Sequence, residues 1–123
     1  MRRYTVTVTT AADGTAVACS PRVSGKIHSI NYVKDGSNPY ATGVDFAVTG
    51  EVSGENIWAQ ADVNASAVKY PRAATHGQDG AAALYAAGGT PIQERVALAG
   101  DRVKIAIAQG GNAKVGKFHI LVD

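Results

Sequence analysis

Segments of alternating apolar and polar residues run through most of the chain. Residues 3–10, 44–49, 102–109 and 115–122 alternate with a period of two, which is the pattern of a strand with one buried face. Residues rich in Gly, Asp, Asn and Pro separate these segments and are typical of turns. The pattern therefore predicts an all-β protein built of short strands.

Two further segments are apolar without simple alternation. Residues 23–33 carry apolar side chains on both parities, which predicts either a strand covered on both faces or a bulge that shifts the register. Gly25 is the candidate bulge position, because a strand-interior glycine often marks one. Residues 57–60 form a short apolar strand that holds the only tryptophan, Trp58.

Turn signals predict how these strands pair. Asp13-Gly14 is a strong hairpin signal, so residues 15–20 are expected to fold back on the first strand. Residues 92–98, 102–109 and 115–122 are expected to form a three-stranded meander. Together these elements predict an antiparallel β-sandwich, of which a jelly roll is one form.

The alternation disappears between residues 62 and 91. This stretch contains several Gly and Pro residues and an Ala-rich run at 81–87 that is long enough for only one or two helical turns. So long an irregular stretch inside a compact domain is typically functional or ordered by a partner. We therefore predict a long irregular loop or arm at about 62–91 that contacts a protein partner. The candidate contact residues are Tyr70, Arg72, Leu84 and Tyr85, since Tyr and Arg are enriched at interface hot spots.

Composition supports the strand prediction and excludes several classes of protein. The chain has 14 Val, 7 Ile and 9 Thr but only 3 Leu, 1 Met and 3 Glu, which argues against a helix bundle or a doubly wound α/β enzyme. Its 123 residues correspond to one domain, 1–123. A net charge of +2 is too balanced for a non-specific nucleic-acid binder. No apolar run reaches the ~20 residues of a membrane-spanning helix, so neither nucleic acid nor membrane is an expected partner.

The candidate chemistry is sparse. The three histidines, His28, His76 and His119, lie far apart in the sequence. Asp79 lies three residues from His76, but both are in the irregular stretch, where three-residue spacing fixes no geometry. We therefore expect no catalytic residues, no metal and no cofactor, and the chain is not predicted to be an enzyme. A small hydrolase that uses His76 and Asp79 stays open as a minor alternative.

A carbohydrate-binding module is a second alternative. Aromatic rings stack on the apolar faces of sugars, and such a module would present two or three rings on one exposed face. Core and interface packing is the simpler interpretation of the rings, because their spacing does not put them on one strand face. The aromatic candidates are Trp58, Tyr32, Tyr40, Tyr70 and Tyr85.

The C-terminal half resembles small all-β proteins encoded in the structural-gene clusters of tailed bacteriophages and prophages. The stretches that carry the resemblance are AAALYAAGGT at 81–90, ERVALAGDRVK at 94–104, QGGN at 109–112 and GKFHI at 116–120. Residues 27–45 and 54–71 are similar in style. The resemblance is to a class of virion structural proteins and carries no catalytic motif.

The resemblance implies a component of the virion. Its most direct form is a decoration or cement protein that binds the major capsid protein on the head surface, as a homo-oligomer in which a trimer is favoured. Such a protein is made in the cytoplasm of the host bacterium, and the alternation of residues 4–9 lacks the continuous apolar stretch of a signal peptide. A neck or tail component is the alternative within the same class.

Overall fold

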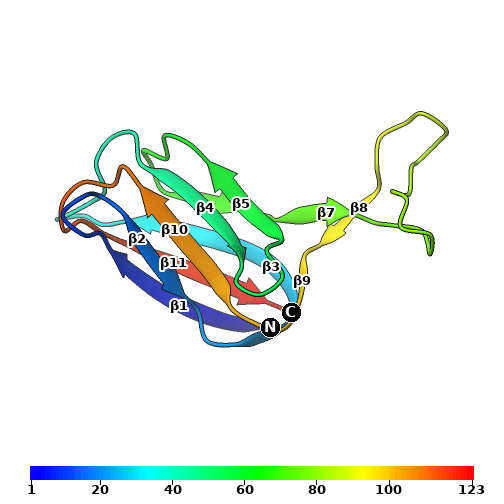
Figure 1. Cartoon of the computed structure of the whole chain (residues 1–123), viewed down its shortest axis with the longest axis horizontal. Helices are drawn as coiled ribbons and strands as arrows, with labels where there is room; N and C mark the ends of the chain where they lie inside the picture. Colours follow the sequence, from blue (N-terminus) through cyan, green and yellow to red (C-terminus); the bar gives the residue numbers. More distant parts are fainter.

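The computed structural model describes all residues from Met1 to Asp123. It contains eleven strands and no helix, and an arm projects from one side (Figure 1). The strands are β1 (Arg2–Thr9), β2 (Ala16–Cys19), β3 (Val23–Lys34), β4 (Asp45–Gly50), β5 (Asn56–Gln60), β6 (Ala67–Lys69), β7 (Arg72–Ala74), β8 (Gln93–Arg95), β9 (Ala97–Asp101), β10 (Val103–Ala108) and β11 (Val115–Val122).

Two antiparallel sheets form the body of the protein. One has the order β1-β11-β3-β6, with β9 also paired to β3, and the other has the order β2-β10-β4-β5. When β7, β8 and β9 are set aside, the first strand pairs with the last, β2 with β10, β3 with β6, and β4 with β5. This is the pairing of one long antiparallel ribbon rolled into two layers, which defines a jelly roll. The predicted all-β sandwich is thus confirmed.

An aromatic cluster joins the two sheets in the core. Tyr32 and Phe118 come from one sheet, and Phe46 and Trp58 from the other. The ring of Phe46 lies edge-on to Tyr32, Trp58 and Phe118 at centroid distances of 4.8, 5.4 and 5.2 Å. These are favourable geometries for aromatic pairs. The strands around the cluster supply the buried aliphatic residues Val6, Val8, Ile30, Val48, Val103, Ile105, Ile107, Ile120 and Val122.

The predicted pairing of the N-terminal segment is wrong. Asp13-Gly14 does form a turn, in which Gly14 has a φ of 82° and its N–H donates to the Ala11 carbonyl over 3.0 Å. The turn connects two layers, however, because β1 pairs with β11 and β2 pairs with β10. The inward positions of β1 and β2 both pack on the same core, so the chain arches over that core instead of folding back within one sheet.

The predicted C-terminal meander is also wrong. Strand β9 pairs with β3, strand β10 lies between β2 and β4, and β11 lies between β1 and β3. Residues 99–101, expected to form a turn, belong to β9. The predicted strand at 92–98 is divided into β8 in the arm and β9 in the sheet. The bulge predicted at Gly25 is confirmed, because the register of β3 against β9 shifts between Val23 and Gly25.

Tyr40 closes one end of the sandwich. Its ring is buried, and its hydroxyl donates to the Val8 carbonyl over 2.6 Å. Burial of the ring raises the pKa of Tyr40 well above its usual value. The ring lies against Gly116 of β11, where an added Cβ would come within 2.4 Å of Tyr40 Cε2. Gly116 is therefore required for this close approach.

We expect Gly116→Ala to lower the free energy of unfolding by about 1–3 kcal/mol, because the new methyl group overpacks a rigid, buried ring. Chemical denaturation followed by tryptophan fluorescence measures this change. Gly36→Ala is the matched control, since nothing lies within 4 Å of its Cβ position. Equal stabilities of the two variants would contradict the account.

Candidate functional site

The arm leaves the sandwich through a gap in the pairing along β3. This strand is twelve residues long, and its outer edge is shared by two short strands. Strand β6 pairs with residues Ile30–Tyr32, and β9 pairs with the segment Val23–Lys26. After β6 the chain leaves the edge of the sheet as β7. It returns as β8 and continues into β9, which pairs with β3 again. The arm therefore lies between the two strands that share this edge of β3.

Local contacts anchor the root of the arm at this gap. The Ile27 N–H donates to the Val96 carbonyl over 2.9 Å. The carbonyl of His28 accepts a hydrogen bond of 3.3 Å from Arg72 Nη1. The ring of Tyr70 packs edge-on to that of His28 at a centroid distance of 6.0 Å. Arg72 thus donates to a backbone carbonyl of β3 that pairs with neither β6 nor β9.

Beyond its stem, the arm divides at a three-way junction. The stem is the ladder of β7 with β8. At its end Thr75 N–H donates to Ile92 O, Ile92 N–H to Ala83 O, and Ala83 N–H to Thr75 O, over 2.8, 2.9 and 2.7 Å. These three bonds form a closed cycle, and all three residues are half-buried. Two small loops, residues 76–82 and 84–91, leave from this cycle.

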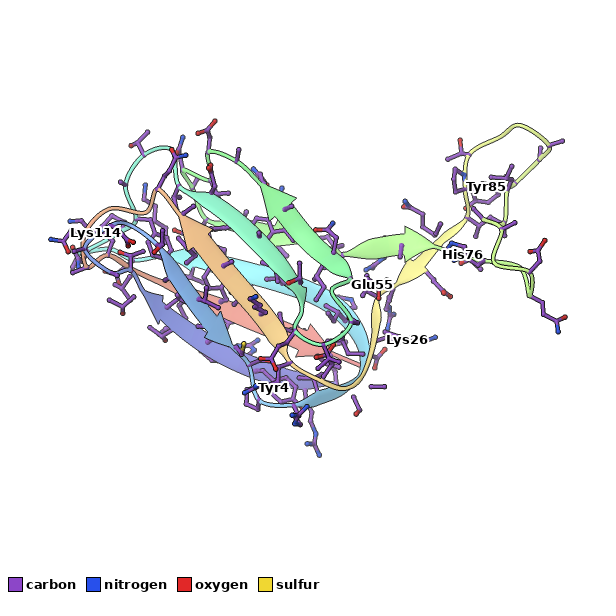
Figure 2. All side chains as sticks on the ribbon, in the orientation of Figure 1. Tyr4, Lys26, Glu55, His76, Tyr85 and Lys114 are labelled. Atoms are coloured by element: carbon purple, nitrogen blue, oxygen red, sulfur yellow. The ribbon has the colours of Figure 1, made fainter.

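The arm has no hydrophobic core of its own. No residue between 72 and 95 is buried, and Tyr85 and Leu84 have exposed fractions of 75% and 40%. Figure 2 shows Tyr85 far out on the arm and His76 nearer the stem. Residues 80–93 carry no charge. The arm is thus held by backbone hydrogen bonds, and its outer part, which we call the tip (residues 80–91), exposes apolar groups to water.

The predicted contact residues fall into two groups. Tyr70 and Arg72 lie at the root of the arm, whereas Leu84 and Tyr85 lie on its tip. The predicted arm at 62–91 is displaced from the observed projection, which runs from 72 to 95, because β6 belongs to the sandwich. The Ala-rich run at 81–87 forms no helix; Ala82 and Leu84 make isolated bridges instead.

Sequence reasoning missed an open recess beside the root of the arm. It has a volume of about 440 Å³ and is lined by the turn after β4 (Val52 and Ser53), by strand β9 and by Arg22. The carboxylate of Asp101 accepts the backbone N–H groups of Val52, Ser53 and Arg102 over 2.9, 3.2 and 2.7 Å. These hydrogen bonds lower the pKa of Asp101, and the bond from the Val52 N–H has the largest effect.

A second, polar cleft lies at the root of the arm. Its volume is about 530 Å³, and it is lined by Lys26, Arg72, Asp123 and the three residues of β8. Arg95 forms an ion pair with Asp123, which lowers the pKa of that carboxyl. Arg72 lies directly opposite Arg95 in the β7–β8 ladder, an unfavourable pairing of like charges. Neither cleft was detectable from the sequence, because their linings come from strands that pair over long distances.

The candidate reactive residues do not assemble into a site. Asp79 accepts the N–H of Ala81 over 3.0 Å and so stabilises its own loop, and His76 forms a bridge with Ala82. The half-buried Cys19 thiol donates to Glu51 over 3.0 Å, and burial raises its pKa. No three His, Cys, Asp or Glu side chains are grouped to hold a metal ion. The chain also forms no helix that is long and apolar enough to span a membrane.

The aromatic residues form no sugar-stacking platform in the sandwich. Trp58, Tyr32 and Tyr40 are buried in the core, with exposed fractions of 7%, 1% and 5%. Only Tyr70 and Tyr85 remain highly exposed, one at the root and one on the tip of the arm. The rings are therefore split between core packing and the projecting arm.

Comparisons with known proteins reveal no relative of this chain. No family model matches the chain, and no curated protein or solved structure is significantly similar to it. The class of protein that the fold defines is an all-β jelly-roll sandwich with an arm inserted between β6 and β9.

We expect Arg72→Ala to loosen the arm without unfolding the sandwich, because it removes the side-chain bond to the His28 carbonyl. Backbone order parameters from nitrogen relaxation should fall in β7 and β8 from the rigid value of about 0.85 towards about 0.6, and stay unchanged in β11. Arg3→Ala, at an exposed position of β1, is the control. Unchanged order in β7 and β8 would show that Arg72 does not anchor the arm.

Proposed function

We propose that this protein is a structural component of a bacteriophage virion, in the form of a decoration or cement protein on the capsid surface. The observation that carries the proposal is the arm, a projection without a core of its own whose tip carries no charge and exposes apolar side chains. Exposed apolar surface of this kind marks interaction sites in soluble proteins. The sequence resemblance to small virion proteins supports the same conclusion.

The sandwich fits this role as a rigid support. Fold alone does not define function, but a surface component of a particle needs a compact body, a contact element and no reactive site. The body is stabilised by a continuous core of 21 buried residues that does not depend on the tip. The arm is the contact element, and it joins the protein to its neighbours on the particle.

The partner in this proposal is the major capsid protein, bound by a homo-oligomer, with a trimer favoured. An oligomer engages several capsid sites at once, and the resulting avidity makes binding much tighter than that of a single copy. Loss of the arm should therefore weaken attachment to the capsid even where the sandwich itself makes contacts.

The test replaces residues 76–91 by Asn-Gly. Thr75 and Ile92 are paired at the end of the stem, so a two-residue turn closes the hairpin in register. We expect the intact protein to co-sediment with empty capsids assembled from the major capsid protein of the same gene cluster. The shortened protein should bind at least about tenfold more weakly, a loss of about 1.4 kcal/mol, with an unchanged melting temperature.

Val17→Ser is the control for this experiment, because Val17 is an exposed apolar residue of β2, far from the arm in the sequence. Its binding should equal that of the intact protein. Absence of binding by the intact protein would refute the decoration role, and undiminished binding by the shortened protein would refute the role of the arm.

A further inference from the structure

The segment 81–85 crosses the end of the stem as a short extended strand. Ala81, Ala83 and Tyr85 make four backbone hydrogen bonds along one edge of this segment, with lengths between 2.7 and 3.2 Å. Two of these bonds join the segment to the part of the chain that enters the junction, and two join it to the part that leaves. One edge of the segment is therefore paired within the protein.

The opposite edge of the same segment is unpaired. The N–H and C=O groups of Ala82 and Leu84 make no hydrogen bond within the protein, although these residues form bridge pairs with His76 and Pro91. In an antiparallel ladder such positions alternate with the bonded ones, so their backbone groups point away from the paired edge. Both residues are exposed. The segment thus presents two donors and two acceptors to water.

This free edge lacks the features that protect strand edges in most proteins. Such edges are blunted by charged side chains, by proline or by bulges. Residues 80–90 contain neither a charge nor a proline. The methyl groups of Ala81, Ala82 and Ala83 are too short to cover the backbone beside them. The edge is therefore open to another chain.

The chemistry of the edge indicates the kind of ligand that fits it. Donors and acceptors on alternate residues match the backbone of a second extended polypeptide. Leu84 and Tyr85, which are 40% and 75% exposed, put one apolar side chain on each face of the segment. Residues 80–93 offer no charged group to an ionic ligand. The complementary ligand is therefore an uncharged, extended segment of protein.

We propose that the partner adds a strand to the free edge at Ala82–Leu84. An extended segment of the partner pairs with Ala82 and Leu84 through backbone hydrogen bonds, and its alternate side chains pack on Leu84 and Tyr85. Backbone bonds supply affinity in this mode of recognition, and the alternate side chains supply specificity. The inference deepens the proposed function, on which it rests, because it assigns an extended, uncharged segment of the major capsid protein as the element that the arm binds.

The first test replaces Ala82 by proline. Proline removes the N–H from the free edge and puts its ring there, which blocks strand addition. The arm should keep its fold, because the N–H of Ala82 has no partner within the protein. We expect Ala82→Pro to bind empty capsids, assembled from the major capsid protein of the same gene cluster, at least about tenfold more weakly than the intact protein. Co-sedimentation measures this change.

Ala87→Pro is the matched control, because it adds the same residue to the tip away from the free edge. Ala87 is the second residue of a turn in which the Gly89 N–H donates to the Ala86 carbonyl over 2.8 Å and Gly88 has a φ of 70°. Proline is favoured at this position of a turn. Ala87→Pro should therefore bind capsids as well as the intact protein does.

A second test removes one N–H and leaves the side chain in place. The α-hydroxy analogue of leucine at position 84 replaces the amide by an ester, and the same change at position 87 is its control. Each ester weakens one preceding carbonyl, that of Ala83 or Ala86, and each of these carbonyls accepts one hydrogen bond in the tip. We expect the ester at position 84 to weaken capsid binding at least about threefold, and the ester at position 87 to leave it unchanged.

The outcomes separate this inference from the decoration role. If the intact protein binds capsids, equal binding by the two proline variants, or by the two esters, would overturn the inference and leave the decoration role standing. Absence of capsid binding by the intact protein would overturn both. If Ala82→Pro disturbs the junction, seen as lost amide protection at Ala83 and Ile92, the ester pair decides.

Discussion

The pairing capacity of β3 governs the layout of this protein. The strand is long, it has one continuous partner, β11, on its inner side, and it has two short partners, β6 and β9, on its outer side. Backbone groups of a strand need hydrogen-bond partners, and those at the gap are supplied by Val96 and by the guanidinium of Arg72. The arm therefore has a fixed point of departure, and its root is part of the sheet edge.

Buried packing and exposed apolar groups are divided between two parts of the chain. The sandwich buries its aromatic cluster and its aliphatic residues between two sheets that close as a rolled ribbon. The arm relies on the β7–β8 ladder and on the cycle of bonds among Thr75, Ala83 and Ile92. Segments with few buried apolar contacts open with little free energy. A partner that covers the tip would therefore bury apolar groups and make local opening of the arm less favourable.

The sequence was informative where structure is local. Alternation identified β1, β4, β10 and β11, whereas the loss of alternation placed the start of the arm at residue 62, ten residues before β7. Pairing could not be predicted, because Asp13-Gly14 specifies a turn but not which sheet receives β2. The β9 recess likewise combines Arg22, Val52 and Leu98, which only the rolled ribbon brings together. Of the four predicted contact residues, Leu84 and Tyr85 are on the tip, whereas Arg72 bonds to β3 and Tyr70 packs on it.

We propose that the tip of the arm is a surface that binds another protein. Hydrogen–deuterium exchange of the unaltered protein, free and bound to empty capsids, tests this proposal most directly. The account predicts that amides of residues 76–91 exchange at least about tenfold more slowly in the bound state, while β3 and β11 exchange equally slowly in both states. Equal exchange of the tip in both states would contradict the claim.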